Sequence, residues 1–401
     1  MQAILGISDM QVQTVEGNPG IGFYLALFLL ALGLSLGATP LVRRIALRIG
    51  IVDAPSARKV HISPVPLLGG LAIFLAFMLA LLGLSYWFLP FYIPQLGAIL
   101  FGATVISFFG FWDDKYGLRP LYKLGAQILV AAWLVVTGVR IELFRFLPFS
   151  DEVNTVVTIL WVVTVTNAIN FIDNMDGLSS GVAAIAAAFF FLAAYQSGQW
   201  LVALLGVALA GAAIGFVYHN FGFIRGHTPI FMGDGGSLFL GYILAAVGIK
   251  LRFSNVDFVT WMVPLLVLGV PLFDISLVVL SRIRRRIPFT RGGKDHTSHR
   301  LVLLGLSKRE AVLVIYLLCG VLGVAALVVT GASIADGYWV GGFLLAAALY
   351  ALYRLEKIPL INTNPKGMSH SKGLKPDKPE IPLQSEPLET PDNLPQPESF
   401  P

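Results

Sequence analysis

Long apolar segments alternate with short polar ones along most of the chain. Each of eleven segments is rich enough in apolar side chains to form a helix, and they span residues 21–42, 67–89, 95–112, 121–139, 153–166, 178–196, 199–218, 236–249, 258–280, 311–329 and 337–353. A helix of ~20 apolar residues crosses the ~30 Å hydrocarbon core of a bilayer. The pattern therefore predicts an all-α polytopic membrane protein with ten or eleven transmembrane helices.

The composition agrees with this fold class. Of the 401 residues, 56% are hydrophobic and 13% are charged, whereas about 25% of the residues in a soluble domain are charged. This excludes a soluble globular enzyme. The single cysteine, Cys319, lies inside an apolar segment, so the chain has neither a disulfide framework nor a cysteine-based zinc site.

The basic residues predict the orientation in the membrane. If the N-terminus lies outside, all but four of the 28 lysines and arginines fall in loops on the cytoplasmic side. Cytoplasmic loops of membrane proteins carry an excess of Lys and Arg. We therefore expect a multi-pass protein of the plasma (inner) membrane whose motif-bearing loops face the cytoplasm. The basic run at 282–286 is typical of contact with anionic headgroups or ligands, and we expect no nucleic-acid partner.

The ends of the chain differ from its centre. Residues 1–20 read as a short extracytoplasmic leader without Lys or Arg, and residues 21–355 form the transmembrane domain that carries the candidate chemistry. Ten of the 23 prolines fall between Pro359 and Pro401. Such a composition cannot form a core, so residues 356–401 are predicted to be a disordered cytoplasmic tail.

The first polar motif closes the third apolar segment. Asp113 and Asp114 are adjacent, and Lys123 follows at the start of the fourth segment. Neighbouring carboxylates at the edge of a low-dielectric region are tolerated best when a cation offsets their charge. A divalent ion is one such partner. The alternative is a pair of helix-capping aspartates with a lysine that reaches toward water.

The second and third motifs interrupt apolar sequence at helix ends. Asn170, Asp173 and Asp176 lie within two helical turns, which suits the lining of a cavity, although buried amides that tie helices together are the alternative. Phe231 and Asp234 belong to a glycine-rich stretch before a short helix. Such a helix start admits a phosphate, and a carboxylate there favours Mg²⁺ bridging to it; a simple turn is the alternative.

The fourth motif is the loop 291–301, which holds three cationic residues and two histidines, His296 and His299. Guanidinium and ammonium groups suit a pyrophosphate. Zinc lacks a third ligand here, and a solvated basic loop remains an alternative. The loop after the first helix adds a further polar stretch with Lys59 and His61. Asp274, about eight residues inside an apolar segment, is expected to face the interior, either as catalytic support or as a buried pair.

The order and common side of these motifs resemble the polyprenyl-phosphate N-acetylhexosamine-1-phosphate transferase family, glycosyltransferase family 4, from about Asp53 to Arg309. The stretch with Lys59 and His61 is similar to the branch that uses UDP-N-acetylglucosamine. The phospho-N-acetylmuramoyl-pentapeptide transferase branch is the alternative. Two departures bear on the choice of sugar: Asn174 stands between two aspartates where the family usually has glycine, and His296-Thr-Ser-His299 replaces the commoner His-x-His-His.

The resemblance implies attack by a polyprenyl phosphate on the β-phosphorus of a UDP-N-acetylhexosamine, with release of UMP. It further implies Mg²⁺ as the cofactor, with Mn²⁺ as an alternative ion, and it allows a homodimer. Asp234, Asp113 and Asp114 would bind the metal, and with His296 and His299 they form the expected catalytic set. The expected substrate-binding residues are Lys123, Asn170, Asp173, Asp176, Phe231, Arg300, Asn220, Lys59 and His61.

A rival class is a secondary transporter of an anionic solute, because intramembrane acids also mark transport paths. Transport predicts polar residues near the membrane midplane or on both sides. This chain confines nearly all of them to the predicted cytoplasmic ends of its helices. The sequence therefore favours the transferase over the transporter, and over an inactive scaffold.

Overall fold

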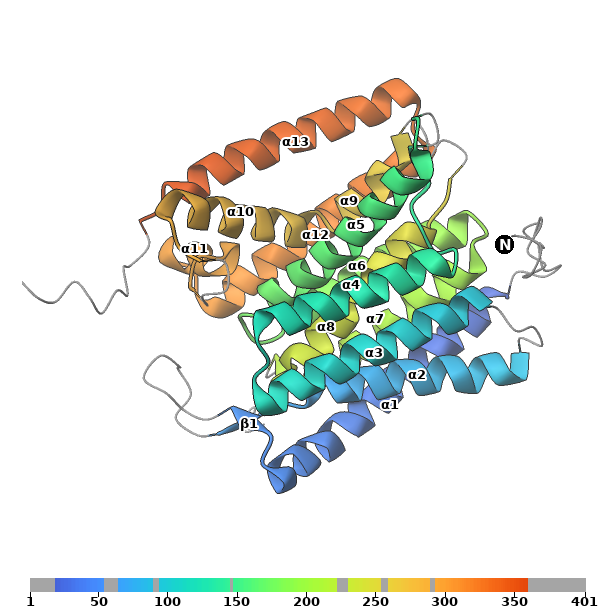
Figure 1. The fold of residues 1–401 in the computed structure, drawn as a ribbon, viewed down its shortest axis with the longest axis vertical. Helices are drawn as coiled ribbons and strands as arrows, with labels where there is room; N and C mark the ends of the chain where they lie inside the picture. Colours follow the sequence, from blue (N-terminus) through green and yellow to red (C-terminus); the bar gives the residue numbers. More distant parts are fainter. Residues whose placement is uncertain are drawn as a thin grey trace, which may run out of the picture. The chain divides into compact units, whose positions relative to one another are not determined.

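The structure is a computed structural model that describes residues 19–53, 64–88, 94–144, 147–221, 230–253, 259–288 and 293–359. In this part of the chain the fold consists of helices and one short hairpin (Figure 1). The elements are α1 Ile21–Ile49, β1 Val52–Asp53, β2 Val65–Pro66, α2 Gly69–Phe88, α3 Pro94–Tyr116, α4 Pro120–Val136, α5 Ser150–Ile172, α6 Leu178–Gln196, α7 Trp200–Asn220, α8 Gly233–Lys250, α9 Met262–Val267, α10 Gly269–Arg285, α11 Thr297–Leu303, α12 Lys308–Gly331 and α13 Ile334–Glu356.

The hydropathy pattern predicts these elements well. Seven of the described helices are long and apolar enough to cross a membrane, and the shorter apolar helices are Gly69–Leu84 and Pro120–Val136. Every predicted apolar segment coincides with a helix except 258–280, which is divided into α9 and α10. The all-α polytopic class is therefore confirmed, while the number of spans and their orientation stay predictions.

A proline explains the division of the segment 258–280. Pro271 lies four residues after Val267, the last residue of α9. In a continuous helix its ring would clash with the Val267 carbonyl, and its missing N–H would leave that carbonyl without a partner. The chain therefore turns at Leu268 and starts again as α10. This turn gives α10 a direction of its own across the bundle (Figure 1).

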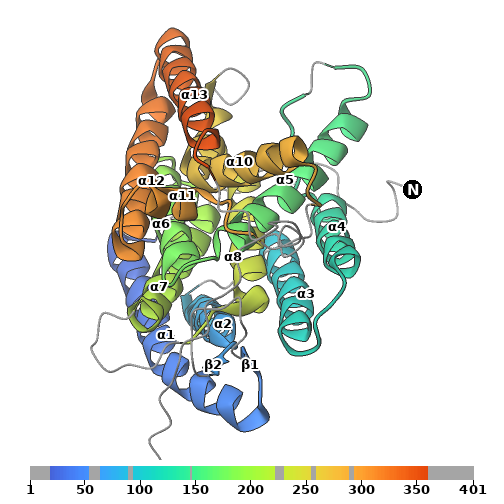
Figure 2. The ribbon, with the colours of Figure 1, turned by 90° about the vertical axis from the view of Figure 1, so that its left-hand side faces the viewer.

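Helix α8 forms the centre of the bundle. It is buried without interruption from Gly235 to Ile249, as expected for a helix that is apolar on all sides. It contacts α2, α3, α5, α6 and α7, and Figure 2 shows it surrounded by other helices. Glycines permit the close approach: a Cβ on Gly110 of α3 would lie 2.5 Å from the Cα of Gly235, and one on Gly241 would lie 2.6 Å from the Cα of Thr166 in α5.

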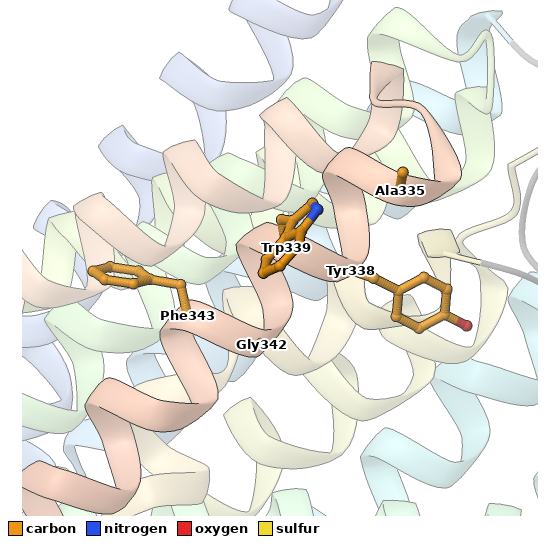
Figure 3. A pocket seen from close by; sticks show the side chains of 5 residues that line it. All are labelled: Ala335, Tyr338, Trp339, Gly342 and Phe343. Atoms are coloured by element: carbon orange, nitrogen blue, oxygen red, sulfur yellow. The ribbon is translucent and has the colours of Figure 1, made fainter.

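Helix α13 is the opposite case. Gly337 is its one buried residue, and its aromatic side chains are exposed. A shallow apolar hollow of about 630 Å³ lies along it, lined by Ala335, Tyr338, Trp339, Gly342 and Phe343 (Figure 3). No charged side chain lines this hollow. An exposed apolar helix with this composition suits contact with lipid, and the polar chemistry of the chain lies elsewhere.

The hairpin joins the start of α2 to the start of α8. In it, Val52 pairs with Pro66 and Asp53 with Val65 in antiparallel register. The backbone N–H of Gly69 donates to the carbonyl of Phe231 at 2.9 Å, and that of Phe231 donates to the carbonyl of Pro66 at 2.8 Å. These bonds fix the segment that leads into α8, and they place its first turn beside the C-terminal end of α3.

Candidate active site

Four side chains converge at one end of the bundle, and we call Asp113, Asp114, Lys123 and Asp234 the acidic centre. The two adjacent aspartates come from the last turn of α3, the lysine from the first turn of α4, and Asp234 from the first turn of α8. The C-terminal end of α3 lies on the left of Figure 1, the side that faces the viewer in Figure 2. The end of α3 and the start of α4, which are close in sequence, thus meet the start of α8, which follows more than 100 residues later.

Asp114 holds the start of α8 in place. Its Oδ1 accepts from the backbone N–H of Asp234 at 2.7 Å, and its Oδ2 accepts from that of Gly235 at 3.0 Å. These donors belong to the first turn of a helix, whose N–H groups have no partner within the helix, and the helix dipole favours a carboxylate there. Gly233 turns into the helix at φ +77°, a conformation that suits glycine. Asp114 therefore orients the carboxylate of Asp234.

Lys123 bridges the other two carboxylates. Its Nζ lies 2.8 Å from Oδ2 of Asp113 and 2.6 Å from Oδ2 of Asp234. The remaining oxygen of Asp234 accepts from Nδ2 of Asn170 at 2.9 Å, and the same amide nitrogen lies 2.8 Å from Oγ of Ser237. The second motif thus reaches the third through Asn170. This arrangement brings together four residues that the sequence selects for different motifs.

The donor set of the acidic centre fits a hard divalent cation. Asp113 and Asp234 already share one positive charge, so the space between them favours a cation. Mg²⁺ is usually held by one or two carboxylates together with substrate phosphates and water. Among the described residues, no group of three or more His, Cys, Asp or Glu side chains forms a complete metal site. Asp114, with both oxygens bound to backbone, is better suited to support than to ligation.

Asp173 and Asp176 follow α5, in the turn that leads to α6. Asp173 is accessible to solvent but has protein atoms around most of it. This desolvation, followed by the negative charges of Asp234 and Asp114, raises its pKa well above the usual range. Burial also raises the pKa of Asp176, while Lys308 opposes the shift. Both carboxyls therefore resist ionisation beside the negative charges of the acidic centre, and a cation bound there would favour their charged forms.

Three amide side chains at this end of the bundle have partners that suit structural roles. Asn167 and Gln127 pair through their amides, with Nδ2 of Asn167 2.6 Å from Oε1 of Gln127, and this pair ties α5 to α4. Asn220 accepts from the backbone N–H of Gly177 at 2.5 Å and donates to the carbonyl of Ile230 at 2.8 Å. With both ends of its amide bound to backbone, Asn220 favours a structural role over the expected substrate contact.

Charged side chains of the last motif and of α10 lie together, and we call Arg282, Arg285, Asp295 and Arg300 the arginine cluster. Arg285 is exposed, and the other three are buried. Asp295 accepts from Nε and Nη2 of Arg282 at 2.9 and 3.0 Å, and from Arg285 at 2.9 Å. Burial raises the pKa of the Asp295 carboxyl, but the bonds and charge of Arg282 outweigh this and hold the pKa below its ordinary value. The carboxylate is thus saturated by guanidinium groups of α10.

Arg300 is engaged by groups of the protein itself. It is fully buried, and its guanidinium donates to the carbonyls of Asp295 and Leu355, to Oγ of Ser281 and to Oε2 of Glu356. The sequence predicts a phosphate contact for this residue. All three nitrogens are instead engaged by protein groups, which favours a structural role that joins α11 to α10 and to the end of α13.

His296 and His299 lie side by side, with ring centroids 6.3 Å apart. Burial, followed by the nearby charges of His296 and Lys294, lowers the pKa of His299 to about 4, so His299 is neutral at pH 7. Nδ1 of His296 lies 2.9 Å from Oδ2 of Asp274. This contact agrees with both roles that the sequence leaves open for Asp274, which are catalytic support and a buried pair.

Sequence reasoning missed the role of Ser298. Its hydroxyl donates to Oδ1 of Asn174 at 2.6 Å, and this bond joins the turn after α5 to α11. The sequence marks Asn174 as unusual, but a serine between two histidines carries no signal of its partner. Of the other expected residues, Phe231 is half-buried before α8, whereas Lys59 and His61 lie outside the described residues.

Comparisons of the amino-acid sequence with known proteins point to one family. Residues 96–252, which include the acidic centre and the turn after α5, match the model of glycosyl transferase family 4. A Bacillus subtilis protein named "Probable undecaprenyl-phosphate N-acetylglucosaminyl 1-phosphate transferase" is 36% identical over 325 residues, which cover 79% of this chain and 87% of that protein. The chain belongs to glycosyl transferase family 4.

Two further relatives have names that describe the same kind of transferase. The decaprenyl-phosphate N-acetylglucosaminephosphotransferase of Mycobacterium tuberculosis is 33% identical over 322 residues, covering 72% of this chain and 78% of that protein. The undecaprenyl-phosphate alpha-N-acetylglucosaminyl 1-phosphate transferase of Yersinia pestis is 27% identical over 315 residues, with 77% and 85% covered. The branch of the family that the sequence predicts is thereby confirmed.

Proposed function

We propose that this family 4 protein transfers N-acetylglucosamine 1-phosphate from UDP-N-acetylglucosamine to undecaprenyl phosphate in the membrane. An oxygen of the lipid phosphate attacks the β-phosphorus of the nucleotide sugar. The bond between that phosphorus and the bridging oxygen breaks, and UMP leaves with this oxygen. The products are polyprenyl-pyrophosphate-N-acetylglucosamine and UMP. The observation that carries the proposal is the acidic centre, in which Asp113 and Asp234 converge on one positive charge.

The chemistry requires charge neutralisation more than proton transfer. Two anionic phosphates must approach each other, and fixed positive charge at the reacting oxygens lowers the barrier. A phosphate monoester has its second pKa near 6, so the lipid phosphate is already largely dianionic at neutral pH. The attack then needs no general base. Lys123, held by two carboxylates, supplies one positive charge from this chain.

The other residues of the site orient these charges. Asn170 fixes one oxygen of Asp234, and Asp114 fixes the helix turn from which Asp234 projects. Asp113 and Asp234 would hold Mg²⁺, which neutralises phosphate charge when bound. Asp173 and Asp176 would contact the nucleotide-sugar side of the site, and Phe231 would contact the uracil ring. The names of the relatives support N-acetylglucosamine as the sugar.

The decisive experiment measures nucleotide release from purified protein with Mg²⁺, undecaprenyl phosphate and a panel of UDP-N-acetylhexosamines, and it separates UMP from UDP. We expect UMP that depends on both lipid and metal, with UDP-N-acetylglucosamine as the best donor. Release of UDP would indicate ordinary glycosyl transfer. Folded protein that releases neither nucleotide would contradict the proposal and favour transport.

A substitution in the acidic centre tests the site itself. Asp234→Asn removes a charge but keeps the size of the side chain, and we expect UMP release to fall by about 10³-fold, as when a preorganised charge is lost from an active site. Asp151→Asn is the matched control, because Asp151 lies at the other end of α5 with its side chain 74% exposed. Equal activity of the two variants would contradict the assignment.

We also propose that the acidic centre faces the cytoplasm of the cell that makes the protein. The basic residues at this end support this orientation through the positive-inside rule. Cys319 is the single cysteine of the chain and is buried, so a Cys319→Ala background allows single cysteines to be introduced at positions 150 and 294. A membrane-impermeant maleimide added to intact cells should label position 150 and spare position 294. The reverse pattern would overturn the orientation.

A further inference from the structure

Asp274 is a buried carboxylate in the middle of α10, with 1% of its surface exposed. Both of its oxygens have partners in the segment that starts α11. Oδ2 lies 2.9 Å from Nδ1 of His296, and Oδ1 accepts from the backbone N–H of Thr297 at 2.6 Å. A buried carboxylate is costly unless its oxygens are hydrogen-bonded, and these two bonds provide the compensation. They also fix the backbone at Thr297 and the ring of His296.

The contact determines which ring nitrogen of His296 is available. A carboxylate only accepts hydrogen bonds, so Nδ1 carries a proton that it donates to Asp274. Nε2 is then the atom left for other partners. Among the described residues none forms a hydrogen bond with Nε2. The ring can therefore present one defined nitrogen, as an acceptor when neutral and as a donor when protonated.

The ring of His296 lies beside the last turn of α5, the turn that also bears Asn170. The ring of His296 packs edge to face against Phe171 of α5, with centroids 6.2 Å apart. Phe171 directly follows Asn170, whose amide binds Asp234. The last turn of α5 therefore contacts the His296 ring through Phe171 and the acidic centre through Asn170, and α10 packs against the same helix. A substrate that carries more than one phosphate could reach both.

The neighbouring charges do not share in this contact. Arg282 and Arg285 bind Asp295, and Arg300 binds Ser281 and Glu356. Asp274 is thus bonded to the ring of His296, while the arginines of the cluster have partners within the protein. Capping of α11 alone needs only the bond from Thr297, which an asparagine could accept equally well. The second bond, from Nδ1–H of His296, requires a second acceptor oxygen, which an asparagine lacks.

We propose that Asp274 is a positioning residue that fixes the ring and tautomer of His296, so that Nε2 contacts a phosphate oxygen of the bound substrates. The proposal rests on the proposed function for the identity of that anion. It assigns Asp274 no contact with substrate. When Nε2 is protonated, the carboxylate also offsets the positive charge of the ring, as an aspartate does behind a catalytic histidine.

The kinetic test uses Asp274→Asn, His296→Gln and the double variant in the UMP-release assay. Asparagine can still accept from Thr297, but its amide N–H faces Nδ1 and forces the other tautomer. We expect Asp274→Asn to lower kcat by about 10- to 100-fold, as supporting groups behind a functional histidine do, with KM changed less than kcat. If Asp274 acts through His296, the double variant is no slower than His296→Gln alone.

A structural control distinguishes this from a loss of fold. Asn154 is buried and accepts from the backbone N–H of Phe144, far from the acidic centre along α5. Asn154→Ala combined with His296→Gln should give the product of the two single effects. If Asp274→Asn combined with His296→Gln also gives a product, Asp274 serves the fold only, and the proposal is wrong.

A spectroscopic measurement is independent of turnover. The ¹⁵N shifts of the ring of His296, identified by their loss in His296→Gln, should show a proton on Nδ1 in the wild type. Addition of UDP-N-acetylglucosamine should shift Nε2 more than Nδ1. A proton on Nε2 alone, or no response of Nε2 to the nucleotide sugar, would overturn the proposal even if Asp274→Asn fails to fold. Wild-type protein that shows the tautomer and the Nε2 response but releases no UMP would contradict only the proposed reaction.

Discussion

The acidic centre and the arginine cluster lie at the same end of the bundle but balance their charges in opposite ways. In the arginine cluster, the carboxylate of Asp295 is bound by two guanidinium groups, and Arg300 is fully buried among protein acceptors. In the acidic centre, Asp113 and Asp234 share the single ammonium of Lys123, and Asp114 binds only backbone N–H groups. One group of charges is satisfied within the protein, and the other retains an excess of negative charge.

This difference separates residues that stabilise the fold from residues that carry out chemistry. A saturated set of buried ion pairs has no capacity left for a ligand, and its removal acts on stability. An unbalanced set attracts a cation and, through it, a phosphate. By sequence alone the basic loop is the stronger phosphate-binding candidate. The geometry instead gives Arg300 protein partners at all three guanidinium nitrogens, and it leaves Nε2 of His296 without a hydrogen bond to the described residues.

The largest effect that separates the two groups is expected for Lys123→Ala. Without the ammonium, Asp113 and Asp234 face each other with no positive charge between them, and the repulsion displaces both carboxylates. We expect UMP release to fall by about 100-fold or more, and higher Mg²⁺ to restore part of it. Lys115→Ala is the matched control, because the exposed Lys115 lies over the ring of Tyr116. Similar activity of the two variants would refute the role of Lys123.

A substitution in the arginine cluster should act on stability. Asp295→Asn leaves Arg282, which is 4% exposed, as a buried charge without its counter-ion. Removal of one partner of a buried ion pair costs about 3–5 kcal/mol. Thermal unfolding in detergent should show a large decrease in the melting temperature. Asp151→Asn, which removes a surface pair with Arg140, should cost less than about 1 kcal/mol. Equal melting temperatures would show that the arginine cluster is not structural.

The sequence predicts the helices and the members of the acidic centre because both follow from residue type. Apolar segments of sufficient length must be helical in a bilayer, and adjacent acids at helix ends need a cation. It could not distinguish Asn170 from Asn220, since the two amides differ only in their partners: Asp234 in one case, backbone groups in the other. The break at Pro271 was also missed, because the apolar residues on both sides of it form one continuous segment.

The comparison can be sharpened by pH, with His299 as the smallest of these effects. Burial, followed by the charges of His296 and Lys294, lowers the pKa of His299 from 6.5 to about 4. Below pH 6.5 the unfolded chain binds a proton at this residue that the folded protein does not bind until about pH 4. The folded state therefore loses stability as the pH falls through this window, by at most about 3 kcal/mol.

His299→Asn has no such proton to bind, so its melting temperature should decrease less than that of the wild type between pH 6.5 and pH 4. Above pH 7 the two curves of melting temperature against pH should be parallel. Curves that stay parallel in the acid window would show that the pKa of His299 is not lowered by folding, so that this residue is protonated below its ordinary pKa of 6.5 and is available there as a cationic partner for phosphate.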